Sequence, residues 1–182
     1  MRPPHLPARR RALAALSVAF LAPLTRAAGQ ADATSILSRY GAAPEFQGID
    51  TWLNSRPLTI AALRGNVVMV HVWTHGCINC IHTLPHVVQW HEKYRDRGLT
   101  VVGIHTPEFA FERETGNVKR AIERHGIRYA VGQDNKFATW NAYRNRYWPT
   151  AYLVDRSGEL VFQHAGEGLY EETERAIQLL VA

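Results

Sequence analysis

Two cysteines, Cys77 and Cys80, are the residues of this chain best suited to do chemistry, and they are the only cysteines in the sequence. Their Cys-x-x-Cys spacing brings them close enough to form a disulfide with each other. A short β-branched run, residues 67–72, precedes them and predicts a buried strand, and apolar residues at helical spacing follow them. The pair therefore lies where a strand ends and a helix begins. There, unpaired backbone N–H groups and the helix dipole stabilise a thiolate, which is the nucleophilic form of cysteine.

A Cys-x-x-Cys pair can also serve three other purposes. A structural disulfide would close so small a ring that it would add little stability. A zinc site needs four ligands, and without a second cysteine pair only histidines could complete it. Covalent haem attachment requires a histidine directly after the second cysteine, where this chain has Ile81. Redox chemistry is therefore the role that the pattern favours.

The first 31 residues have the pattern of a secretory signal peptide. Arginines at the start are followed by an apolar run, residues 12–24, and then by small residues. The apolar run is shorter than the ~20 residues that a membrane span needs, so an uncleaved membrane anchor is the lesser alternative. Arg10-Arg11 also resembles, weakly, a twin-arginine signal. We therefore predict a periplasmic protein from which residues 1–31 are removed.

The basic character of the whole chain comes from this segment. The sequence holds 21 Lys and Arg against 16 Asp and Glu, and five of the arginines lie in residues 1–31, which contain no acid. The remaining 16 basic residues therefore balance the 16 acidic ones. Nucleic-acid binding, which needs a basic face on the folded domain, is not expected.

Beyond the signal peptide we expect a flexible linker over residues 32–44 and one globular domain over residues 45–182. The alternation of apolar and polar residues over 46–54 predicts a short hairpin. Further strands are predicted at 67–73, 99–104, 129–132, 151–154 and 160–163, and helices at 77–97, 117–125, 134–144 and 171–180. This order predicts an α/β fold: a three-layer α/β/α sandwich with a mixed central sheet and an N-terminal β-hairpin extension.

Over about residues 45–182 the chain resembles extracytoplasmic thioredoxin-like proteins of the TlpA and DipZ type. The resemblance rests on Trp73 four residues before Cys77, on the cysteine pair itself, on Pro85 in the following helix, and on Trp148-Pro149-Thr150. The amino-acid sequence around these features is most similar to the soluble domain of DipZ-type proteins. The resemblance implies a thioredoxin fold and a protein thiol–disulfide oxidoreductase.

The resemblance also assigns roles to individual residues. Cys77 would be the exposed nucleophile and Cys80 the buried resolving thiol. Pro149 would be a cis-proline packed against the disulfide. The backbone of Trp148 would pair with the substrate chain. The residues expected to bind the substrate are Trp73, Trp148 and Thr150.

The proton acceptor for the resolving thiol departs from the family pattern. Many thioredoxins have a buried carboxylate six residues before the nucleophile, and this chain has His71 there. His71 is therefore our first candidate for the acceptor and Glu108 the second. The alternative for His71 is a neutral, hydrogen-bonded core histidine. Between the cysteines, Ile78-Asn79 carries no positive charge, which favours a reductant over an oxidant.

We therefore predict disulfide exchange with exported protein substrates, cytochrome c apoprotein among the possibilities, by a monomer that a membrane electron donor re-reduces. No cofactor and no resident metal are expected. Two alternatives stay open. Cys77 and Cys80 could hold Cu(I), with His75 or His82 adding nitrogen, in a copper-delivery module. The pair could also serve a thiol peroxidase.

Overall fold

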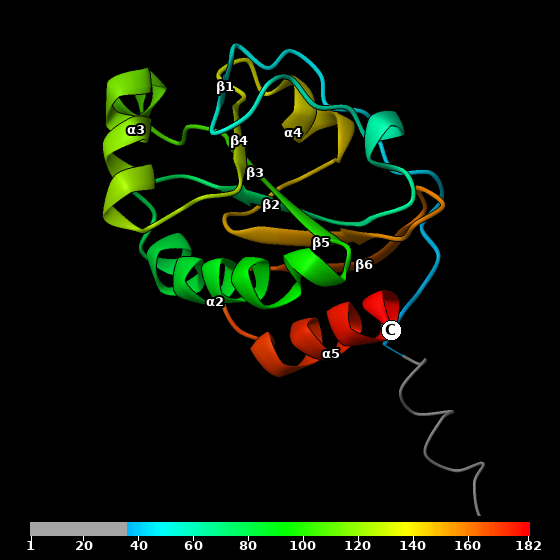
Figure 1. Ribbon diagram of the computed structural model, residues 1–182. Helices are drawn as coiled ribbons and strands as arrows, with labels where there is room; N and C mark the ends of the chain where they lie inside the picture. Colours follow the sequence, from blue (N-terminus) through cyan, green and yellow to red (C-terminus); the bar gives the residue numbers. More distant parts are fainter. Residues whose placement is uncertain (1–35) are drawn as a thin grey trace, which may run out of the picture.

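The computed structural model describes residues 36–182, which form a mixed six-stranded sheet covered by helices on both faces (Figure 1). The strands are β1 (Thr51–Leu53), β2 (Val67–Trp73), β3 (Leu99–His105), β4 (Ala130–Gln133), β5 (Thr150–Val154) and β6 (Leu160–Ala165). The α-helices are α2 (Ile78–Tyr94), α3 (Thr115–Arg124), α4 (Ala138–Ala142) and α5 (Tyr170–Val181), and the short 3-10 helices are η1 (Ala61–Leu63), η2 (Arg95–Arg97) and η3 (Ala110–Arg113).

The strands are arranged in the order β1-β4-β3-β2-β5-β6. β2 lies inside the sheet, parallel to β3 and antiparallel to β5, and all of its residues are buried. Because side chains alternate along a strand, Met69 and Trp73 join the core on the face covered by α2, α3 and α5, whereas Val70 and Val72 join the core beneath α4. His71 therefore points to the same face as α2.

Helix α2 positions the cysteine pair. Cys77 is its N-cap, with extended backbone angles, and Ile78 is the first helical residue. One face of the helix is buried against the sheet, and this face includes Cys80, Leu84 and Val87. Burial of this face, rather than local propensity, holds the helix in place, because Pro85 inside it removes one backbone hydrogen bond.

The expected N-terminal hairpin is not formed in the described part of the chain. Residues 51–53 instead make the single edge strand β1, which pairs antiparallel with β4. Phe46, Ile49 and Trp52 pack onto the core beneath α4. The alternation of apolar residues that predicted two paired strands therefore reflects packing onto an existing core.

Residues 38–43, within the range expected to be a linker, run along β6. The backbone N–H groups of Ser38 and Tyr40 donate to the carbonyl oxygens of Val161 and Leu160 at 2.8 and 2.9 Å. Ala42 forms an isolated antiparallel bridge with Glu159. This segment therefore covers the outer edge of the sheet.

The predicted signal peptide, residues 1–31, lies outside the described residues. Over residues 36–182, no helix combines the length and the apolar character that crossing a membrane requires.

Gly103, in β3, lies in the tightly packed core on the face of the sheet that α2 covers. A Cβ atom there would lie 3.0 Å from Trp73 Nε1 and 3.1 Å from a ring carbon of Tyr129. Since both rings are fixed in a dense core, we expect Gly103→Ala to lower the free energy of unfolding by about 1–3 kcal/mol. Urea denaturation would measure this change. The control is Gly116→Ala on the exposed first turn of α3, where a Cβ would make only an ordinary contact with the Arg120 side chain at 3.6 Å. This substitution should not lower that free energy.

Candidate active site

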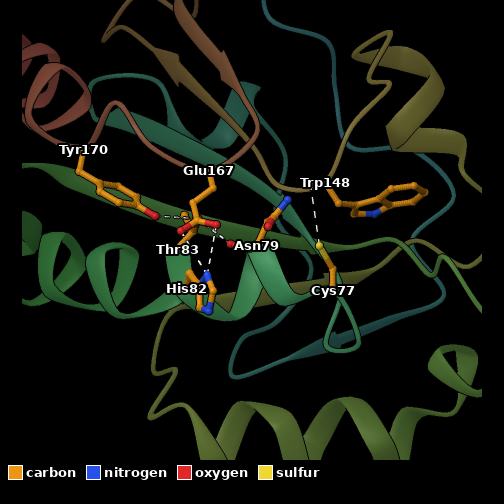
Figure 2. Close-up of polar contacts among 7 residues, drawn as sticks. All are labelled: Cys77, Asn79, His82, Thr83, Trp148, Glu167 and Tyr170. Carbon is orange, nitrogen blue, oxygen red and sulfur yellow. Dashed lines mark hydrogen bonds and ion pairs between the residues drawn. The ribbon is translucent and has the colours of Figure 1, made fainter.

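The two cysteines differ sharply in exposure. Cys77 is half-buried, whereas Cys80, one turn into α2, has no exposed surface. Both are free thiols, and the Sγ–H of Cys77 donates to the carbonyl oxygen of Trp148 at 3.9 Å (Figure 2). Of the two sulfurs, that of Cys77 is therefore the one that an incoming substrate can reach.

Electrostatics favour the same assignment. Burial raises the pKa of the Cys80 thiol strongly, and the neighbouring Cys77 and Glu112 add to this effect against a backbone hydrogen bond at Thr74. Cys80 is therefore protonated at rest. A thiol of this kind attacks only after a base has removed its proton.

The segment opposite Cys77 is rigidly held. The Trp148–Pro149 peptide bond is cis, as the family resemblance implied. The indole N–H of Trp148 donates to the Thr106 carbonyl oxygen at 2.9 Å, and its ring lies against that of Trp140 with centroids 4.2 Å apart. The carbonyl oxygen of Pro149 accepts from the Gly166 N–H at 2.7 Å. Trp148 thus forms one fixed wall beside the nucleophile.

Of the three residues expected to bind substrate, only Trp148 reaches the surface. Trp73 is fully buried and packs edge-on against His105, with ring centroids 5.0 Å apart. Thr150 is 3% exposed, and its hydroxyl donates to the Tyr147 carbonyl oxygen at 2.8 Å. Trp73 and Thr150 therefore support the site from below and do not line its surface.

His71 lies beneath the pair and is completely buried. Neither of its ring nitrogens has a hydrogen-bond partner among the described residues, so it is not the hydrogen-bonded core histidine that was the alternative to a proton acceptor. It lines a small cavity that also includes Thr83, Pro149, His164 and Tyr170. Burial lowers the pKa of His71 to about 3, so the imidazole is neutral at physiological pH and is a weaker base than an exposed histidine.

The second candidate for the acceptor, Glu108, has an exposed side chain, and a different carboxylate occupies the interior. Glu112 is completely buried. Its carboxylate accepts the backbone N–H groups of Gly76, Glu108 and Phe109 at 2.8, 2.6 and 2.8 Å. Glu112 thus connects the loop after β3 to the residue directly before Cys77.

Sequence reasoning missed Glu112. The one available signal was its place as third residue of a helical turn, where a glutamate can bind the N-cap N–H, here that of Phe109. Burial alone would raise the pKa of Glu112. Hydrogen bonds from the backbone of Phe109, Glu108 and Gly76 and from the Thr74 hydroxyl outweigh this effect and hold the pKa below its usual value.

On the other side of Cys77, polar contacts join α2 to the loop before α5 (Figure 2). His82 Nδ1 lies 3.2 Å from both carboxylate oxygens of Glu167. The hydroxyl of Thr83 donates to the Asn79 carbonyl oxygen at 2.8 Å and lies 3.4 Å from the Tyr170 hydroxyl. The His82–Glu167 pair is solvent-exposed, and such pairs contribute only ~0–1 kcal/mol.

Known proteins resemble this chain in sequence and in fold. A model of the AhpC/TSA family matches residues 41–163. The chain belongs to the AhpC/TSA family. DipZ of Mycobacterium tuberculosis is 44% identical over 153 residues, which make up 82% of this chain but only 22% of DipZ. The chain therefore spans about a fifth of the length of this curated relative.

Other similar proteins match along most of their length. YkuV of Bacillus subtilis, which is named a thiol-disulfide oxidoreductase, is 29% identical over 138 residues, 75% of this chain and 93% of YkuV. The solution structure of a thioredoxin-like protein in its oxidized form has a TM-score of 0.72 and 28% identity, and covers 79% of this chain and 95% of that one. The predicted thioredoxin fold and the thioredoxin-like, DipZ-type resemblance are confirmed, and these names support the prediction of an oxidoreductase.

The contrast between the cysteines predicts their order of alkylation. In the reduced protein, a maleimide should modify one thiol quickly, and peptide mapping should identify it as Cys77, because Cys80 is buried and its pKa is raised. Cys80→Ser should react at the wild-type rate. Cys77→Ser should react at least ~10-fold more slowly, since only the buried thiol is left. Equal rates for the two variants would contradict the structure.

Burial of His71 predicts an acid-sensitive stability. A histidine in the unfolded chain titrates near pH ~6.5, whereas His71 in the folded protein titrates at about 3. Between these values the unfolded state binds a proton that the folded state does not, so the free energy of unfolding falls as the pH falls. The slope for one such group approaches ~1.4 kcal/mol per pH unit.

In the His71→Leu variant, the free energy of unfolding should therefore fall less steeply as the pH falls from 6 to 4. The slope should differ from that of the wild type by up to the contribution of about one proton. Urea denaturation at a series of pH values would measure it. Met69→Leu, a substitution of a neighbouring core residue that does not titrate, should change the stability but leave the slope unchanged. A His71→Leu slope equal to that of the wild type would show that His71 is protonated in the folded protein.

Proposed function

We propose that this protein is a periplasmic thiol–disulfide oxidoreductase that reduces disulfides in exported proteins. The observation that carries the proposal is the pairing of an accessible Cys77 at the N-cap of α2 with a buried Cys80 in the next turn. The names of YkuV and DipZ-type relatives support it. Export rests on the signal-peptide pattern of residues 1–31.

The reaction takes place in two exchanges. The Cys77 thiolate attacks one sulfur of the substrate disulfide, forms a mixed disulfide and expels the other substrate sulfur as a thiolate, which takes up a proton. Cys80 then loses its proton to a base, for which the neutral His71 on the same side of the sheet is our candidate. The Cys80 thiolate attacks Cys77 Sγ, which closes the Cys77–Cys80 disulfide and releases the reduced substrate. An electron donor in the membrane must then reduce the pair.

The surface around Cys77 suits a protein substrate. Three apolar side chains, Ile78, Phe109 and Phe111, are each more than half exposed, at 59%, 53% and 55%. The two phenylalanine rings stack with centroids 5.9 Å apart. A Cβ at Gly76, directly before the nucleophile, would lie 3.3 Å from the ring of Phe111. An unfolded or extended chain could bury its own apolar residues here beside its disulfide.

No observation favours the copper-delivery alternative. Of the two histidines that could have completed a copper site, His75 stacks on His105 with centroids 5.4 Å apart, and His82 pairs with Glu167. Within residues 36–182, no group of three or more His, Cys, Asp or Glu side chains is placed to hold a metal ion.

Trapping tests the proposed function. In the Cys80→Ala variant the mixed disulfide on Cys77 cannot be resolved, so exported proteins should accumulate on it as adducts that dithiothreitol releases. Non-reducing electrophoresis and mass spectrometry would identify them. A Cys77→Ala, Cys80→Ala double variant is the matched control and should trap nothing. Absence of adducts, together with rapid consumption of hydrogen peroxide by the reduced wild type, would overturn the proposal in favour of a thiol peroxidase.

A further inference from the structure

Glu112 is a buried anion that no cation neutralises within the described residues. None of the ion pairs among residues 36–182 includes it. The donors to its carboxylate are neutral: three backbone N–H groups and the Thr74 hydroxyl. The nearby histidines add no charge at neutral pH, because burial lowers the pKa of His75 and lowers that of His105 to about 3. A full negative charge therefore remains inside the protein.

This charge lies directly behind the nucleophile. Glu112 Oε1 accepts the backbone N–H of Gly76, the residue before Cys77. The approach is so close that a Cβ at Gly76 would clash with that oxygen. The contact spans residues far apart in the sequence and fixes the loop from which α2 begins.

We propose that Glu112 is a positioning residue that holds the Cys77 loop and, through its negative charge, makes the cysteine pair more reducing. The inference rests on the proposed function, because it concerns the direction of the same disulfide exchange. Glu112, rather than the two residues between the cysteines, would then account for the bias toward a reductant.

The physical reason lies in the charges of the two redox states. Oxidation of the pair joins Cys77 Sγ to Cys80 Sγ and releases two protons and two electrons, which reduce the substrate S–S bond to two thiols. The disulfide is uncharged, whereas the reduced pair carries a thiolate for part of the time. A fixed anion nearby therefore destabilises only the reduced form and favours transfer of electrons to the substrate.

Glu112→Gln tests this inference. Reduction potentials would be measured by equilibrating the purified protein with glutathione buffers at pH 8, where the thiolate is well populated, and by counting free thiols after acid quenching. We expect the equilibrium constant to shift toward the reduced pair by roughly three- to tenfold, which corresponds to a rise in potential of about 15 to 30 mV for two electrons.

Two further variants separate the charge from the fold. Glu112→Asp keeps the charge while its shorter side chain weakens the loop contacts, and its equilibrium constant should stay within about twofold of the wild type. Glu114→Gln removes an exposed carboxylate two residues along and should leave the constant unchanged. A shift in Glu112→Asp as large as that in Glu112→Gln would overturn the role of the charge.

A surface variant keeps the test decisive if Glu112→Gln does not fold. Phe111 is exposed and its ring reaches toward Gly76, so Phe111→Lys places a positive charge near the Cys77 loop without disturbing the core. It should shift the equilibrium in the same direction as Glu112→Gln, relative to Phe111→Gln. Equal constants for these two variants would contradict the inference. If the wild type forms no disulfide in any buffer, the proposed function itself fails, which is a distinct result.

Discussion

The structure depends on how the chain passes from β2 into α2. Four residues, 74–77, must leave the centre of the sheet and present Cys77 at the first turn of a helix whose opposite face is buried. The backbone of this loop is fixed by the Glu112 carboxylate on one side, while the fixed Trp148–Pro149 segment lies on the other. Helix α2 can then offer its free N–H groups to a sulfur anion at its N-cap.

The different roles of the two cysteines follow from their positions at this strand-to-helix junction. A residue at the N-cap lies at the surface, whereas a residue three positions later has turned toward the sheet, so the same helical geometry exposes Cys77 and buries Cys80. Burial keeps Cys80 protonated until a base acts on it. His71, on the same face of β2, is neutral and its ring nitrogens have no partner among the described residues, which is why we propose it as that base.

Much of this arrangement could be predicted from local sequence. The strand over residues 67–73 and the helix that follows Cys77 are strongly patterned, and the family resemblance supplied the cis-proline at Pro149. Local patterns failed where the outcome depends on distant contacts. The alternation over residues 46–54 could not distinguish a hairpin from packing onto a core. Helix α4 begins at Ala138, later than expected, because Phe137 adopts a left-handed conformation.

Glu112 shows the same limit within the site. Its neighbours Phe111 and Arg113 are exposed, so nothing in the local pattern marks it as buried. Its role becomes visible only when the loop after β3 folds against the loop before α2, 36 residues earlier. In the same way, the burial of Trp73 and Thr150 depends on the assembled sheet, so the substrate-binding roles expected for them from the resemblance do not fit their positions.

A single-turnover reaction followed by mass spectrometry tests most directly whether Cys77 attacks the substrate and Cys80 resolves the mixed disulfide. The reduced protein would be mixed with a peptide that contains one disulfide, quenched with acid at increasing times, and mapped for the modified sulfur. We expect a transient peptide adduct on Cys77 that decays into the Cys77–Cys80 disulfide with release of the reduced peptide. A first adduct on Cys80, or an adduct on Cys77 that never resolves, would contradict it.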